Sequence, residues 1–316
     1  MWAPRYGSIV DRFRAWATED TAVRAALIVG SQARTVEPAD EWSDLDLVIF
    51  HLYPDQLLGA TDWFGRFGPV VLSMIEPTAV GGGRERRVLY EGGRDVDFSV
   101  FPAFSIPFLA DNAEGASVLR RGFEVLLDKD GQLARLPSLL SATPVPGSGG
   151  PSEEEFDASV ADFWYHVLWT AKKLRRGEIW IAKMACDGYL KRLLGRMIEW
   201  HSMADPAVAA EVRHEGRFLD RWAPASVRAR LPGTFARYDR NDIARALLET
   251  GGLFSELARA TAGNRGWVYP AETESAVRAL VVGTLGDVRR SDRPRRTAPA
   301  PDRPPRDRRA ARGTQA

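Results

Sequence analysis

The sequence predicts an α+β protein with two domains, an N-terminal domain of mixed β-sheet and flanking helices followed by a C-terminal α-helical bundle. Up to about residue 140, short apolar runs alternate with helical stretches. Beyond residue 152, apolar residues recur every three or four positions. Between these regions, Pro, Gly and Ser fill nine of twelve positions, which is typical of a linker. We therefore expect one domain at 1–140, a linker at 141–152 and a helical domain at 153–285.

Six short apolar segments predict the strands of the first domain. They cover residues 24–29, 45–50, 70–75, 87–91, 95–101 and 123–127. Gly92-Gly93-Arg94 is expected to join the fourth and fifth strands as a hairpin turn, because glycine tolerates a positive φ. Helices are predicted over 11–23 and 54–67. Strands interspersed with helices, with one hairpin among them, indicate a mixed sheet with helices packed on it.

The second half reads as successive helices. Ser152 with Glu155 three residues later forms a capping-box pattern, which predicts that a helix begins there and continues to Gly177. Further helices are expected over 179–201, 206–222, 242–261 and 270–285. Several helices with apolar stripes can bury those stripes against one another, so this half is expected to form a bundle.

The last 31 residues, 286–316, differ in composition from the rest. They contain ten Arg, four Asp and five Pro, a net charge of +6, so the other 285 residues carry −5. Such a segment cannot bury enough apolar surface to offset its ordering entropy, and we expect it to be disordered. Nucleic acid is an expected partner only through this tail. No apolar run approaches the length of a membrane span, and we expect a cytoplasmic protein that does not contact membranes.

Asp44-Leu45-Asp46 enters a strongly apolar strand. Residues i and i+2 of a strand point to the same face, so the two carboxylates are expected to project together while Leu45 faces the core. Two like charges side by side repel each other unless a cation lies between them. Carboxylate oxygens are hard ligands that suit Mg²⁺, which proteins often share with substrate phosphates. The pair therefore predicts a magnesium site.

A Gly-Ser turn precedes this pair. Gly30 and Ser31 follow a buried strand, and Gln32-Ala33-Arg34 is expected to begin a helix. Glycine lets a phosphate approach the backbone, and the N–H groups that open a helix favour an anion. The turn therefore predicts a phosphate site beside the magnesium site.

A third carboxylate would complete a site for two metal ions, which clamp the attacking and leaving oxygens of an in-line displacement. In the strand predicted over 95–101, Asp95, Asp97 and Ser99 share one face. Periodicity alone does not choose between the two aspartates.

Taken together, these motifs resemble the nucleotidyltransferase superfamily that includes DNA polymerase β. Within it, the chain is similar to the aminoglycoside 6-adenylyltransferases, the streptomycin-modifying resistance enzymes. The spacing of twelve residues from Ser31 to Asp44 carries the resemblance, as do LYEGGRDVD at 89–97 and VLLDKDG at 125–131. In the helical half, DFW at 162–164 and MIEWH at 197–201 are also similar. The resemblance covers about residues 1–285.

The resemblance implies transfer of AMP from Mg²⁺-ATP to a hydroxyl of an aminoglycoside, with release of pyrophosphate. Gly30 and Ser31 would hold the triphosphate, and Asp44 and Asp46 two Mg²⁺ ions. Asp97 matches the third carboxylate of the family better than Asp95 and is the first candidate for proton acceptor.

The chain departs from the family at residue 32, where Gln replaces a frequent Arg, and Arg34 is expected to make that phosphate contact. Lys183 and Asp187 are four residues apart, hence on one helix face, and could offer a phosphate contact and an alternative base. An ordinary surface ion pair is an equally good interpretation of these two residues.

Two alternatives remain at this point. The same nucleotidyl transfer could use another acceptor, namely a different small molecule, a protein hydroxyl or a nucleic-acid end. The chain could also be a nucleotide-binding module without catalysis.

Overall fold

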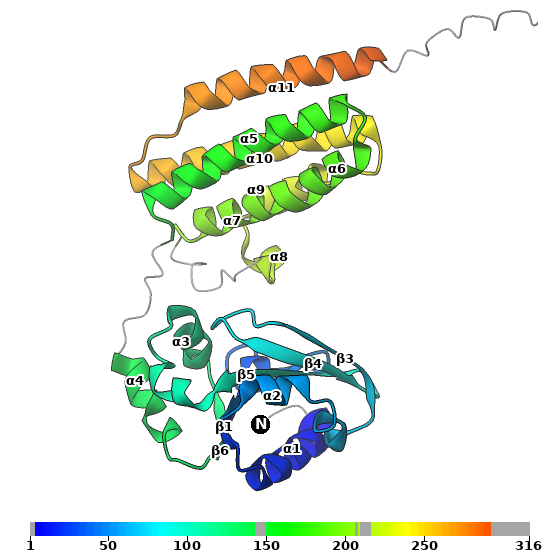
Figure 1. Ribbon diagram of the computed structural model, residues 1–316. Coiled ribbons are helices and arrows are strands. Elements are labelled where there is room, and N and C mark those ends of the chain that lie inside the picture. The colour runs from blue at the N-terminus through cyan, green and yellow to red at the C-terminus, as the bar shows by residue number, and fades with distance from the viewer. Residues whose placement is uncertain (1–3, 143–149, 206–207, 209–215, 292–316) are drawn as a thin grey trace, which may run out of the picture. The chain divides into compact units, whose positions relative to one another are not determined.

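The computed structural model describes residues 4–142, 150–205, 208 and 216–291, with side chains described up to residue 286 (Figure 1). The chain divides into two compact units, Met1–Ser148 and Gly149–Ala316. The division falls inside the segment 141–152 that was expected to be a linker. The first unit carries the sheet, and the second is helical throughout its described residues.

The first unit is built on a six-stranded mixed sheet. Its strands are β1 (Val23–Val29), β2 (Leu45–His51), β3 (Val70–Pro77), β4 (Arg84–Tyr90), β5 (Arg94–Pro102) and β6 (Glu124–Asp128). They lie in the order β3-β4-β5-β2-β1-β6. β2 and β5 run parallel, and the other neighbours run antiparallel. All six predicted strands are present, and Gly92 and Gly93 form the hairpin turn with φ of +77° and +65°.

The two faces of the sheet are covered differently. On one face, Leu45, Leu47 and Phe98 pack in an aromatic-rich core against α1 (Gly7–Glu19), α2 (Pro54–Gly59) and the 3₁₀ turn Phe64–Phe67. The other face is covered further along the strands by the 3₁₀ helix Ala103–Phe108, α3 (Ala113–Arg120) and α4 (Leu136–Ala142). Short 3₁₀ turns also occur at Pro4–Tyr6, Gly30–Gln32 and Leu133–Arg135. Asp46 and Asp97 alternate with the apolar residues of the first core and therefore point to the second face.

Two helix predictions in this unit need correction. The helix expected over 11–23 is α1, which begins earlier and ends at Glu19, because the Asp20 side chain accepts a hydrogen bond from the Ala22 N–H (2.9 Å) and turns the chain into β1. The helix expected over 54–67 is broken after Gly59 into α2 and a separate 3₁₀ turn. Glycine is a poor residue for a helix interior, and the break places Trp63 in the core.

The helical unit contains seven α-helices in its described residues. They are α5 (Glu153–Arg175), α6 (Ile179–Met184), α7 (Leu190–Ser202), α8 (Leu219–Trp222), α9 (Ala225–Arg230), α10 (Arg240–Arg265) and α11 (Ala271–Ser291). The capping box of Ser152 and Glu155 is present at the start of α5. Figure 1 shows α5, α10 and α11 side by side. Their apolar stripes form one core that includes the stacked rings of Phe163 and Phe254.

Some boundaries in this half also differ from expectation. The single helix expected over 179–201 contains a π-helical turn, Ala185–Tyr189, between α6 and α7. α11 continues to Ser291, beyond the expected start of the tail at residue 286, and 292–316 lie outside the described residues. Of the segment 206–222, α8 is helical, whereas 206–207 and 209–215 also lie outside them.

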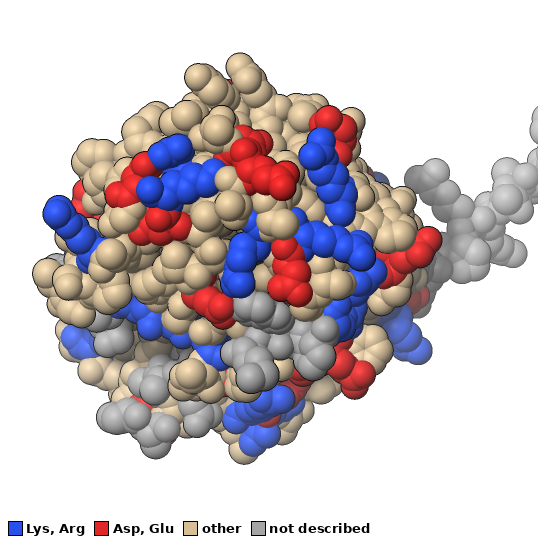
Figure 2. Space-filling view, turned by 90° about the horizontal axis from the view of Figure 1, so that it is seen from below, with Lys and Arg blue, Asp and Glu red and all other residues tan. Residues whose placement is uncertain are grey.

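Charge and hydropathy of the described residues agree with these two packed cores. No helix among them is long and apolar enough to cross a membrane. On the face shown in Figure 2, Lys and Arg side chains are interspersed with Asp and Glu. A continuous basic stripe is not seen among the residues drawn in colour on that face.

Candidate active site

The turn after β1 lies directly over the first residues of β2, because Val29 pairs with Asp46 in the antiparallel register. Gly30 has a φ of +68°, a conformation that L side chains rarely adopt. A Cβ at this position would lie 2.0 Å from Oδ2 of Asp46. Glycine is therefore required here twice, by the backbone conformation and by the closeness of the carboxylate.

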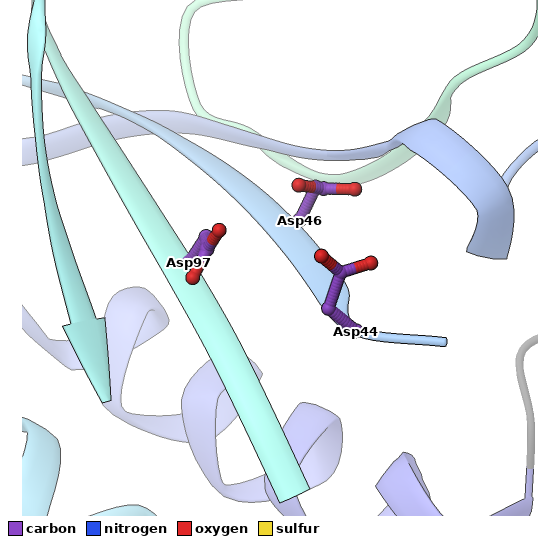
Figure 3. A group of neighbouring side chains, drawn as sticks. All are labelled: Asp44, Asp46 and Asp97. Carbon is purple, nitrogen blue, oxygen red and sulfur yellow. The ribbon is translucent and has the colours of Figure 1, made fainter. Parts of the chain in front are cut away.

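Three carboxylates gather beside this turn (Figure 3). Asp44 immediately precedes β2, Asp46 lies in β2, and Asp97 lies opposite Asp46 in the parallel partner β5. Oxygens of the three residues lie within 4.8 Å of one another. Asp44 is exposed, Asp46 half-buried and Asp97 buried, so the cluster opens to solvent on one side. Asp95, the other residue that periodicity allowed, is exposed and outside the cluster.

β4 adds a charged network that the sequence analysis did not single out. Arg87 lies opposite Asp97 in the register, and its Nη2 lies 3.1 Å from Oδ2 of Asp97. The Nε of Arg87 lies 2.8 Å from Glu76 and 3.1 Å from Glu85. The hydroxyl of Ser99 donates to Glu85 (3.1 Å). The hairpin turn could have revealed Arg87, because counting back from Gly92-Gly93 pairs it with Asp97.

This arrangement raises the pKa of two carboxyl groups. Burial, together with the negative charges of Asp44, Asp97 and Glu85, raises the pKa of Asp46 to about 7. Burial also raises the pKa of Asp97 to about 7, with Glu85 and Asp44 adding to the shift and Arg87 opposing it. One guanidinium does not balance this many carboxylates, so the site favours an added cation.

The residues of the turn differ in what they contact. The Ser31 hydroxyl is buried and has no hydrogen-bond partner among the described residues. Gln32 donates from Nε2 to the backbone carbonyl of Asp44 (2.9 Å) and so fixes the entry into β2. Arg34 donates from Nε to the carbonyl of Glu37 (2.7 Å) in the same loop.

The helix expected to begin at residue 32 is absent from this described loop. Gly30–Gln32 form a single 3₁₀ turn, and the chain continues without a helix until β2. The left-handed conformation of Gly30 and Pro38 downstream are both unfavourable for a regular helix here. The backbone N–H groups of the turn remain, but a helix dipole does not contribute to the site.

Lys183 and Asp187 lie in the helical unit. Lys183 donates from Nζ to Oδ2 of Asp187, and the Ala236 N–H donates to the same oxygen (3.2 Å). Both side chains are largely buried, and Asp187 lies in the π-helical turn. The pair is thus held by backbone from a distant segment, unlike an ordinary surface ion pair.

The donor set of the carboxylate cluster fits a hard divalent cation. Three carboxylates from two adjacent strands offer oxygen ligands within one small volume, which is the chemistry that Mg²⁺ prefers. The raised pKa values of Asp46 and Asp97 indicate like charges that a divalent cation would relieve. The unpartnered Ser31 hydroxyl adds a polar atom beside them.

Comparison with known proteins adds the family. A profile of the family described as streptomycin adenylyltransferase matches residues 5–282. The chain belongs to this family. An aminoglycoside 6-adenylyltransferase of Bacillus subtilis (strain 168) is 22% identical over 273 residues, which are 83% of this chain and 92% of that protein.

A solved structure is also similar. The crystal structure of an aminoglycoside 6-adenyltransferase from Bacillus subtilis matches with 18% identity and a TM-score of 0.42, and the match covers 88% of this chain and 97% of that one. Membership of the streptomycin adenylyltransferase family places the chain among the nucleotidyltransferases, as the motifs around the turn and the carboxylates predicted.

Proposed function

We propose that the protein transfers AMP from Mg²⁺-ATP to a hydroxyl of an aminoglycoside of the streptomycin type and releases pyrophosphate. The observation that carries the proposal is the convergence of Asp44, Asp46 and Asp97 beside the Gly30–Ser31 turn. The family match supports nucleotidyl transfer, and the carboxylate cluster is the described site with the donors that such a reaction needs.

Asp44, Asp46 and Asp97 would hold two Mg²⁺ ions together with phosphate oxygens of ATP. When bound, Mg²⁺ would lower the pKa of the acceptor hydroxyl and neutralise charge that develops on the pyrophosphate. The raised pKa of Asp46 makes it a poor structural anion, because its ionised form is costly without a cation nearby. Its position in the site is thus best accounted for by ligand binding.

Asp97 is the candidate proton acceptor. Arg87 lies against its Oδ2 (3.1 Å), which orients the carboxylate and leaves Oδ1 to accept the proton of the attacking hydroxyl. A pKa raised to about 7 also suits a general base that works near neutral pH. Asp187 in the helical unit is the alternative base, since its Oδ1 has no hydrogen-bond partner among the described residues.

The nucleotide phosphates would contact the turn and two basic side chains. Gly30 lets a phosphate approach the backbone closely, and the buried hydroxyl of Ser31 is available to donate to it. Arg34 and Lys183 would supply positive charge to the phosphate chain. The acceptor is a polycation, and the net charge of −5 on residues 1–285 has the sign that attracts it.

The test is incubation of the full chain with ATP, Mg²⁺ and streptomycin, read by mass spectrometry and pyrophosphate release. We expect an AMP adduct of the drug, and none with Asp46→Asn. Asp95→Asn is the matched control, because Asp95 lies on the same strand outside the cluster, and it should retain activity. An adduct only on another aminoglycoside, metabolite, protein or nucleic acid would change the acceptor. ATP binding without any turnover would support a non-catalytic module.

A further inference from the structure

The helical unit contains a pocket of about 680 Å³ that the proposed roles do not explain. It is formed by the π-helical turn Ala185–Tyr189, one side of α7 and the segments around Gly216 and Phe235. Its volume lies in the range typical of small-molecule sites. All its lining residues belong to this one unit.

Two glycines form part of the pocket lining. Gly188 lies in the π-helical turn and Gly195 in α7, seven residues apart. A Cβ at either position would meet no atom of the described residues within 4 Å. Glycine disfavours a helix interior, and packing within the described protein does not require it at these two positions. Their common effect is to leave the pocket floor open for a ligand.

Two arginines lie on the same side of α7. Arg192 and Arg196 are four residues apart, line the pocket and are exposed. Neither forms an ion pair with a carboxylate among the described residues; their guanidinium groups lie over the rings of Tyr189 (5.3 Å) and Trp200 (5.9 Å). Two arginines without an acidic partner beside an open floor are suited to an anion with several oxygens.

The other charged residues of the lining are already balanced. Lys191 donates from Nζ to the carbonyl of Cys186 (2.8 Å) and to Thr250 (2.9 Å). Asp187 is paired with Lys183, and Glu199 accepts a hydrogen bond from the Gly216 N–H (3.0 Å). The charge left over in the pocket is therefore positive and comes from the two arginines of α7.

We propose that this pocket binds a phosphate chain, held by Arg192 and Arg196 over the floor formed by Gly188 and Gly195. The phosphate chain is either that of the nucleotide or pyrophosphate, and its link to the reaction rests on the proposed function. A cationic acceptor is disfavoured in the pocket because of its excess positive charge.

The experiment measures binding of pyrophosphate to the full chain by calorimetry, in EDTA so that the carboxylate cluster carries no metal. Arg192→Gln combined with Arg196→Gln should weaken pyrophosphate binding about 100-fold, since each arginine loses a charge-assisted hydrogen bond. Arg176→Gln is the matched control, because Arg176 is an exposed arginine of the same unit paired with Glu178 outside the pocket lining, and it should leave binding unchanged.

Gly195→Ala separates binding from folding. This substitution should raise Tm by about 2 °C through helix propensity while weakening pyrophosphate binding at least tenfold. Gly283→Ala, an exposed position inside α11 with equally open space, should raise Tm similarly and leave binding unchanged. Equal affinity of wild type, the double arginine variant and Gly195→Ala would overturn the proposal, as would failure of wild type to bind pyrophosphate.

ATP and adenosine distinguish the two sources of the phosphate chain. ATP competing with pyrophosphate, with adenosine inactive, would assign the pocket to the nucleotide, whereas failure of ATP to compete would assign it to pyrophosphate. AMP transfer is measured separately. Pyrophosphate binding that depends on the two arginines in a chain without transferase activity would sustain the pocket and refute the proposed function. Transfer activity with unchanged binding in the variants would do the opposite.

Discussion

Each unit of the molecule holds carboxylates away from water, and the two groups have opposite surroundings. In the helical unit, Glu274 is buried and accepts hydrogen bonds from Ser255 (2.9 Å), Arg259 (2.7 Å) and Arg278 (2.5 Å). Burial alone would raise the pKa of Glu274, but the hydrogen bonds from Ser255 and Arg278 outweigh it and hold the pKa below the usual value. This carboxylate is fully partnered by the protein.

In the sheet unit, the neighbours of the carboxylates are mainly other carboxylates. Asp46 and Asp97 both have a pKa raised to about 7, with Arg87 as the guanidinium that opposes the shift. The comparison teaches that burial does not by itself identify a functional carboxylate. A partnered one joins helices, whereas a cluster with excess negative charge is arranged for a ligand from outside the chain.

The largest expected effect is on catalysis. Asp46→Asn should lower the rate of AMP transfer by about 1,000-fold or more, because it removes a charge on which the metal site depends. Glu274→Gln, which removes the same charge from the other unit, should leave the rate of the folded protein within about threefold. Initial rates of pyrophosphate release check both. Equal losses in the two variants would remove the distinction between the units.

Next is the effect on stability. Glu274→Gln should lower the free energy of unfolding by about 3 kcal/mol, because two arginines lose their buried carboxylate partner. Asp46→Asn should instead raise the free energy of unfolding by about 1–3 kcal/mol at pH 8 without metal, since an ionised and repelled group becomes neutral. Denaturant unfolding measures both, and Glu272→Gln, an exposed glutamate of the same helix, is the control.

The pH dependence should also have opposite signs. Because the pKa values of Asp46 and Asp97 are raised from 3.8 to about 7, their contribution to stability is present below about pH 4 and is lost as pH rises through 7. The loss is about 2 kcal/mol for this coupled pair. The pKa of Glu274 is lowered, so its contribution is present above pH 4.5 and is lost in acid. Tm measured from pH 4 to 8 in EDTA should fall in wild type and stay flatter in Asp46→Asn. An equally steep fall in both would contradict this assignment.

The smallest expected effect concerns Gln32. Gln32→Ala removes the hydrogen bond to the Asp44 carbonyl and should lower the unfolding free energy by about 1 kcal/mol. Transfer activity should fall about tenfold as Asp44 loses its fixed backbone. Gln56→Ala, at an exposed position of α2, should change neither. Unchanged activity in Gln32→Ala would show that the loop holds Asp44 without this contact.

Much of the fold was predictable from the sequence, because both of its periodicities are clear. The alternation in β2 and β5 correctly placed Leu45 and Phe98 in one core and the aspartates on the opposite face. The break after Gly59 and the π-helical turn at 185–189 were missed, because both depend on packing rather than on apolar spacing. The short helices α3, α4 and α9 carry too few turns to show a period.

The candidate site was predictable in part. Asp44-Leu45-Asp46 and the Gly-Ser turn were visible as motifs, but the choice between Asp95 and Asp97 depends on the depth of each along β5, which periodicity does not give. Arg87 was predictable from the hairpin register, whereas Glu76 comes from an edge strand across a longer turn. The pocket on α7 joins segments that no local pattern connects.

The central claim is that Asp44, Asp46 and Asp97 act together as a divalent metal site. Binding of Mn²⁺, followed by its paramagnetic resonance in the presence of a non-hydrolysable ATP analogue, tests it without any assumption about the acceptor. Mn²⁺ should bind the wild-type chain and Asp95→Asn equally, and bind Asp46→Asn and Asp97→Asn at least tenfold more weakly. Equal Mn²⁺ affinity in all four proteins would contradict the account.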